Sequence, residues 1–200
     1  NLIQYAGQRA IVFVHTQELL YQWADRISDV LGVEPGMIGD DNWSEGPVTV
    51  ATMQTLYERG TDLLEEDYGM AIFDECHVTS AAETMQSVGL SIEVEWRIGL
   101  SATPWRRTPG EEMEIEAVTG DTAAEIGAEQ LIDEGHLARP EFEFVSLSGQ
   151  QLGGYNDEYS DVVRKCIELE PTRNTAVARK AAELAEDGYR VFVSVNRIRQ

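Results

Sequence analysis

Cysteine is scarce in this 200-residue chain, and several other features are missing. The two thiols, Cys76 and Cys166, lie far apart and no C-x-x-C motif occurs, which argues against a disulfide scaffold and a structural zinc site. No apolar run approaches the ~20 residues of a membrane span, and no basic segment leads into an apolar one as in a secretory signal. We therefore expect a cytoplasmic protein that does not contact a membrane.

Positive charge is also scarce. Lys and Arg total 15 against 36 Asp and Glu, the formal net charge is −21, and Lys165 and Lys180 are the two lysines. An acidic solvated surface would explain the excess, but the near absence of lysine favours a halophilic protein. At ~1 M salt the Debye length is only ~3 Å, so these charges are screened and nucleic acid stays a candidate partner. Its site would have to be a local patch of arginine, hydroxyl and backbone amide groups.

The first half of the chain alternates short apolar runs with amphipathic segments. In chain order we expect a strand at 9–14, a helix at 17–32 ended by Gly32, a strand passing into a helix at 47–56 with Thr52 and Thr55 as candidate caps, a strand at 69–75, a helix at 79–92 and a strand at 96–103. Strands alternating with helices predict an α/β fold with a parallel sheet and right-handed crossovers.

The pattern changes from about residue 110. The expected elements are an acidic helical region at 110–137 with Leu131, Ile132 and Leu137 buried, a strand at 139–149 that carries Phe142 and Phe144, a helix at about 158–187 ended by Gly188, and a buried strand at 189–195. Too little sequence follows the last strand to complete a domain.

The segment GMAIFDECHVTS, residues 69–80, places acidic, thiol and imidazole groups directly after an apolar strand. Open α/β sheets bind ligands at the carboxyl ends of their strands. One carboxylate there can hold Mg²⁺, mostly through water, while the other activates an attacking water. A bare Asp-Glu pair is more often solvated acids, but LSATP at 100–104, after another strand, makes the combination specific.

These motifs resemble those of superfamily 2 helicases, in the XPB-like and type III restriction-like branch. FDECH resembles the DEAD/DEAH-box motif II and LSATP resembles motif III. Weaker similarities follow the same order: residues 12–23 to motif Ia, 37–41 to an Ile-Gly turn of this branch, 48–56 to motif Ib, 131–142 to the interdomain junction and 172–198 to motif IV. The resemblance implies a RecA-like parallel sheet, with an incomplete first domain at 1–135 and a junction plus the start of a second RecA-like domain at 136–200.

The resemblance also implies ATP and Mg²⁺ as cofactors and a role for each matched residue. Asp74 would bind Mg²⁺, Glu75 would be the base for hydrolysis, and His77 would couple the nucleotide site to Ser101 and Thr103 of motif III. The residues expected to face the nucleic-acid backbone are Thr16, Gln17, Thr52 and Gln54.

The positions of two arginines and a tryptophan in the sequence indicate further roles. Arg106, beside Arg107 just past the LSATP turn, is a candidate phosphate contact. Trp23 lies on the apolar face of its helix, so we expect it to pack in the core rather than to stack on bases.

The sequence departs from the helicase pattern in several places. It contains no G-x-x-x-x-G-K-[ST] phosphate-binding loop and no motif V or VI, and His15 stands where the family usually has proline. There is no initiator methionine, and we expect the chain to be the middle of a longer motor that does not turn over ATP by itself.

Three alternatives remain open at this point: the motor subunit of a restriction system, a non-catalytic DNA-binding relic, and an unrelated doubly wound domain such as a small-molecule enzyme. The XPB-like character favours DNA over RNA as the partner, and the oligomeric state is left open.

Overall fold

The computed structural model describes residues 2–65, 67–77, 82–103, 111–146, 158–164 and 168–194. The chain divides into two units, Asn1–Ile126 and Gly127–Gln200. Among the described residues, no helix has both the length and the apolar composition needed to cross a bilayer.

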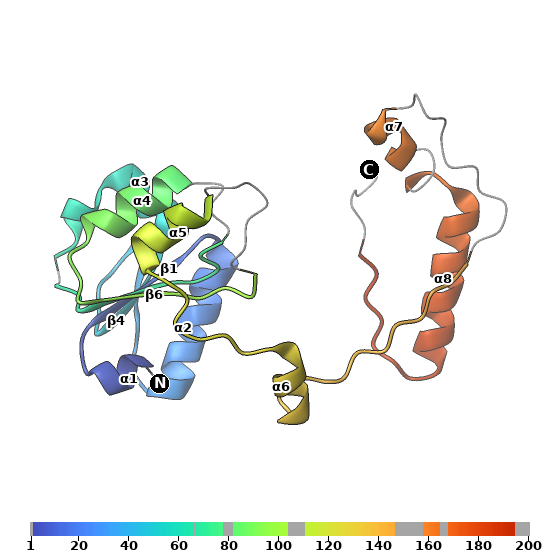
Figure 1. Ribbon diagram of the computed structural model, residues 1–200, viewed down its shortest axis with the longest axis horizontal. Helices are drawn as coiled ribbons and strands as arrows, with labels where there is room; N and C mark the ends of the chain where they lie inside the picture. The colour runs from blue at the N-terminus through green and yellow to red at the C-terminus, as the bar shows by residue number, and fades with distance from the viewer. Residues whose placement is uncertain are drawn as a thin grey trace. The chain divides into compact units, whose positions relative to one another are not determined.

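The first unit is built around a six-stranded sheet in the order β3-β2-β4-β1-β5-β6 (Figure 1). Its strands are β1 (Ala10–Val14), β2 (Gly36–Gly39), β3 (Asn42–Trp43), β4 (Val48–Thr52), β5 (Met70–Phe73) and β6 (Trp96–Gly99). Its helices are α1 (Leu2–Ala6), α2 (Gln17–Leu31), α3 (Met53–Arg59), the 3-10 helix η1 (Thr61–Leu63), α4 (Ala82–Ser91) and α5 (Glu111–Thr119).

Parallel pairing dominates the sheet. Strand β1 pairs in parallel with β4 on one side and with β5 on the other, β2 joins β4, and β6 joins β5. Val14 lies opposite Thr52, and Phe13 lies opposite Phe73. The predicted α/β fold, its four parallel strands and the helices among them are confirmed, with ends that differ by a few residues.

The antiparallel hairpin of β2 and β3 has no counterpart among the predicted elements. Asp40 and Asp41 form its turn with φ values of 49° and 61°. Positive φ at both central residues is the geometry of a type I′ turn, which Asp tolerates better than most residues. Because both strands are short, they carry no periodic pattern that would have predicted them.

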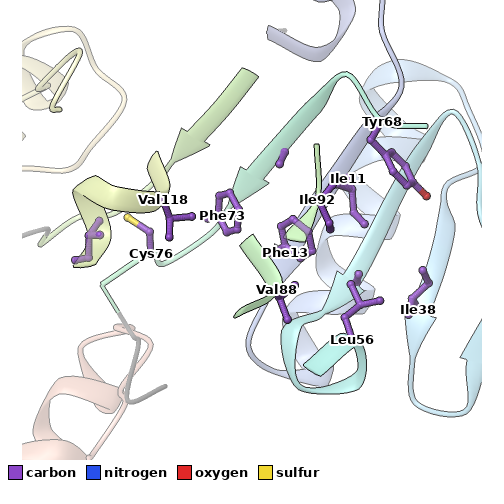
Figure 2. Close-up of a cluster of buried hydrophobic side chains, with 13 residues drawn as sticks. Ile11, Phe13, Ile38, Leu56, Tyr68, Phe73, Cys76, Val88, Ile92 and Val118 are labelled. Carbon is purple, nitrogen blue, oxygen red and sulfur yellow. The ribbon is translucent and has the colours of Figure 1, made fainter. Parts of the chain in front are cut away.

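The two faces of the sheet bury separate apolar clusters. Ile11, Phe13 and Phe73 point towards the face covered by α3, α4 and α5, where they meet Leu56 and Val88 (Figure 2). The rings of Phe13 and Phe73 stack with centroids 4.8 Å apart.

On the opposite face the alternate residues pack against α2. This cluster contains Ala10, Val12, Val14, Val48, Val50, Met70 and Ile72 of the sheet with Leu20 and Ile27 of α2. Strands β1, β4 and β5 are therefore buried on both faces, which explains the continuous apolar sequences of β1 and β5.

Helix α2 ends at Gly32 as predicted, and Thr16 caps its start, which the sequence analysis did not predict. The Thr16 side chain accepts a hydrogen bond from the Leu19 backbone N–H, and Gly32 ends the helix in the left-handed region with φ 67°. Helix α3 differs, because Thr52 occupies the N-cap position without capping through its side chain. Its hydroxyl lies 2.6 Å from the Thr55 hydroxyl instead, so the predicted side-chain cap is wrong.

The described residues of the second unit form helices α6 (Ala128–Asp133), α7 (Tyr159–Val163) and α8 (Pro171–Glu186) and contain no strand. Proline at the start of α8 cannot continue a preceding helix, which explains why the helix predicted at 158–187 is divided. Leu137 is 47% exposed, and Leu131 and Ile132 are only partly buried, so their predicted burial is wrong.

The two strands predicted in this unit are wrong over the residues described. Residues 139–146 and 189–194 have no regular structure, and the side chains of Phe144 and Phe192 are 92% and 90% exposed. A strand needs a neighbouring strand to satisfy its backbone groups, and the described part of this unit offers none. Residues 147–149 and 195 lie outside the described residues.

Truncation of Phe73 tests the stacked core. Phe73 is 1% exposed, so Phe73→Ala should lower the free energy of unfolding by about 3–5 kcal/mol. Phe144→Ala, at a side chain that is 92% exposed, should change it by less than ~0.5 kcal/mol. Urea unfolding followed by circular dichroism measures both, and equal losses in the two variants would contradict this packing.

Candidate active site

The predicted site residues gather at one edge of the sheet. Thr52 ends β4, Thr16 follows β1, Asp74 follows β5 and Ser101 follows β6 shortly after. These four strands are adjacent and parallel, so their carboxyl ends meet there.

The turn after β5 is held by both neighbouring strands. The Asp74 backbone N–H donates to the Phe13 carbonyl at 3.0 Å, and the Cys76 N–H donates to the Leu100 carbonyl at 3.0 Å. Glu75, between them, has φ 48°, a left-handed conformation that is uncommon for a residue other than glycine. Its N–H donates to Asp74 Oδ1 at 3.0 Å, which fixes one oxygen of that carboxylate.

His77 lies between the two predicted motifs. Its Nδ1 is 2.7 Å from Ser101 Oγ and 3.1 Å from Glu75 Oε2, and Ser101 Oγ accepts from the Thr103 N–H at 3.0 Å. The structure thus brings together His77, Ser101 and Thr103, the three residues predicted to communicate.

A single hydrogen on His77 Nδ1 cannot form well-aligned hydrogen bonds to both Ser101 Oγ and Glu75 Oε2. Among the described residues no donor makes a well-aligned hydrogen bond to Glu75 Oε2, although that oxygen is shielded from solvent. The close approach to His77 is therefore an electrostatic contact. It leaves this oxygen with unused acceptor capacity.

Trp23 makes a contact that the sequence did not predict. It packs on the cluster beneath α2, which confirms its predicted place in the core. Its indole Nε1–H also donates to Asp74 Oδ2 at 2.7 Å. The two residues are 51 positions apart, so no local pattern relates them.

The donor set at Asp74 fits Mg²⁺ rather than a more densely liganded metal. Among the described residues no three His, Cys, Asp or Glu side chains gather to hold a metal ion. Mg²⁺ commonly takes one or two carboxylates and completes its shell with water and phosphate oxygens. Each Asp74 oxygen accepts one hydrogen bond and keeps further acceptor capacity, which suits a water-mediated ion.

The residues predicted to face nucleic acid differ in accessibility. Gln17 and Gln54 are exposed, and Gln54 Nε2 donates to Glu58 Oε1 at 2.7 Å. Thr16 is partly buried as the cap of α2, whereas Thr52 is 7% exposed and bonded to Thr55.

Arg106 lies outside the described residues.

Comparison with known proteins assigns the family. Residues 1–106, more than half of the chain, match the family described as type III restriction enzyme, res subunit. The chain belongs to this family. The match confirms the resemblance to the XPB-like and type III restriction-like branch of superfamily 2.

Individual relatives agree with this assignment. A candidate DNA 3'-5' helicase, Rad25, of Haloarcula marismortui is 30% identical over 144 residues, which are 68% of this chain and 22% of that protein. The DNA 3'-5' translocase XPB2 of Sulfurisphaera tokodaii is 35% identical over 101 residues, 48% of this chain and 21% of that protein. The chain therefore spans about a fifth of the length of these relatives.

A solved structure is also similar. The UvsW helicase from bacteriophage T4 has a TM-score of 0.49 and 20% sequence identity, with 58% of this chain and 45% of that chain covered.

The contacts of His77 predict its tautomer. A lone pair on Nδ1 would face the carboxylate oxygen of Glu75 at 3.1 Å, so the neutral ring should carry its hydrogen on Nδ1. Ring ¹⁵N chemical shifts measure the tautomer directly. Glu75→Gln should weaken the preference because an amide can donate to Nδ1, and a wild-type ring with its hydrogen on Nε2 would contradict the arrangement.

Proposed function

We propose that this chain is the core of an ATP-dependent DNA helicase or translocase, which couples ATP hydrolysis to movement on nucleic acid. The observation that carries the proposal is the contact between the Asp74–His77 turn and Ser101 at the carboxyl edge of a parallel sheet. The relatives named as a DNA 3'-5' helicase and a DNA 3'-5' translocase support DNA as the partner. Those names do not favour the restriction motor or the non-catalytic relic.

Each residue of the turn has a proposed task in hydrolysis. Asp74 would hold Mg²⁺ through water, and the bound ion would neutralise charge on the ATP phosphates. Glu75, whose side chain is 39% exposed, would orient the attacking water and accept its proton. His77 would relay the state of this site to Ser101 and Thr103.

The nucleic-acid contact is proposed at the ends of β1 and β4. Thr16 and Gln17 at the start of α2, Thr52 and Gln54 at the start of α3, and Arg106 would contact phosphates. Hydroxyl, amide and backbone N–H groups read no base sequence, so binding would be largely sequence-independent. Thr52 is only 7% exposed, so it would contribute least among these residues.

The domain division remains part of the proposal: a first RecA-like domain over 1–135, and a junction with the start of a second over 136–200. A longer protein would supply the phosphate-binding loop that these 200 residues lack. We also propose a cytoplasmic, halophilic protein on the basis of the −21 net charge and the scarcity of cysteine.

Replacement of Glu75 tests the hydrolytic role. In the longer protein, Glu75→Gln should abolish ATP hydrolysis, a loss of at least ~10²-fold, because an amide cannot accept the proton of the attacking water. ATP binding should be spared. Steady-state turnover and fluorescent-nucleotide binding measure the two effects.

The control is Glu93→Gln, which removes an exposed carboxylate before β6 and should leave turnover unchanged. The 200-residue chain alone should show no turnover. Retained hydrolysis in the Glu75 variant would refute the role of Glu75. Glu75-dependent hydrolysis by the 200-residue chain would instead contradict the expectation that this chain alone is inactive.

Salt dependence tests the halophilic proposal. The free energy of unfolding should rise between about 0.1 M and 2 M KCl, because added salt screens repulsion among the excess carboxylates. Thermal unfolding across this range measures the effect, and sucrose at matched osmolality serves as the uncharged control. A melting temperature that stays constant in KCl would contradict the proposal.

A further inference from the structure

We propose that Trp23 is a positioning residue that holds the Asp74 carboxylate in the orientation needed to receive Mg²⁺. The inference rests on the proposed function, since it gives Asp74 the metal. Its basis is the 2.7 Å hydrogen bond from the indole Nε1–H to Asp74 Oδ2.

Two donors fix the carboxylate from different sides. The Glu75 N–H binds Oδ1 at 3.0 Å and the Trp23 indole binds Oδ2 at 2.7 Å. A carboxylate held at one oxygen can still rotate, whereas bonds at both oxygens set its plane. Both bonds are charge-assisted, and such bonds are about twice as strong as neutral ones.

The indole is suited to this task by its chemistry. It donates one hydrogen and accepts none, so it cannot compete with the carboxylate for the metal. It also keeps its hydrogen across the physiological pH range, so the polarity of the bond is constant.

Helix α2 fixes the position of the indole. Leu20 and Ile27 bury the helix against the sheet, and Trp23 packs on the same cluster. The helix begins after Thr16, about two turns and ~10 Å before Trp23 along the axis. The proposed metal ligand and the proposed nucleic-acid contact are therefore tied to one rigid helix.

The hydrogen bond itself is tested first, by NMR of the ¹⁵N-labelled 200-residue chain. Asp74→Asn should shift the Trp23 indole N–H resonance more than any other indole resonance, because the bond loses its charged acceptor. This measurement keeps Trp23 in place. An unmoved Trp23 resonance would overturn the inference.

The positioning role is tested next with Mn²⁺ as the probe. A Mn²⁺ ion at Asp74 should broaden the backbone amide of Glu75 strongly, because that amide is bonded to the same carboxylate. The broadening that remains in Asp74→Asn comes from Mn²⁺ on other carboxylates and is subtracted. Trp23→Phe keeps an aromatic ring and removes the donor. It should raise the Mn²⁺ concentration for half-broadening by about tenfold, the usual effect of losing a group that orients a metal ligand.

Trp43→Phe is the matched control, because Trp43 is also half-buried but packs on the opposite cluster with Arg59 above its ring at 5.8 Å. It should titrate as the wild type does.

The outcomes distinguish the positioning role of Trp23 from the proposed metal-binding role of Asp74. If Asp74→Asn weakens Mn²⁺ broadening but Trp23→Phe does not, the positioning role is wrong and the proposed function stands. If Asp74→Asn leaves broadening unchanged, Asp74 does not hold the metal, and both the metal assignment and the inference fail.

Discussion

The parallel pairing of β1 with both β4 and β5 is the constraint on which the site depends. It aligns Val14 with Thr52 and Phe13 with Phe73. The carboxyl ends of the three strands therefore lie side by side, and so do the turns that follow them. Burial on both faces holds this register, because a slip of one residue would exchange the side chains facing α2 with those facing α3 to α5. Asp74 would then turn away from Trp23.

Two types of contact build the site on this frame. Backbone hydrogen bonds to Phe13 and Leu100 locate the turn between β5 and β6, and side-chain bonds then orient the groups that the turn presents. The two acidic groups have different surroundings. Asp74 is held at both oxygens, whereas Glu75 keeps an oxygen near His77 without an aligned donor among the described residues.

Much of the first unit could be predicted because its signals are local. Apolar runs predicted β1 and β5, Gly32 predicted the end of α2, and motif order predicted a shared edge. The contact between Trp23 and Asp74 could not be predicted in this way, since it depends on the crossing of α2 over the sheet. The β2–β3 hairpin was not predicted because its strands are too short to show an alternating pattern.

The strands expected at 139–149 and 189–195 are wrong over their described residues, 139–146 and 189–194, for a related reason. Alternating apolar residues such as Phe142 and Phe144 show what a strand would bury, but not whether a second strand is present to pair with it. Pairing is a property of two segments, whereas periodicity is a property of one.

Cys76, the third residue of the DECH turn, is constrained by the space around its side chain. Cys76 points into the core, is 6% exposed, and lies so near Gly99 that a Cβ there would be 3.0 Å from its sulfur. Position 76 accepts only a side chain small enough to leave β6 where it is. A bulkier residue would push on Gly99 and displace the strand that leads to Ser101, so a substitution with no chemistry of its own could still disconnect the two motifs.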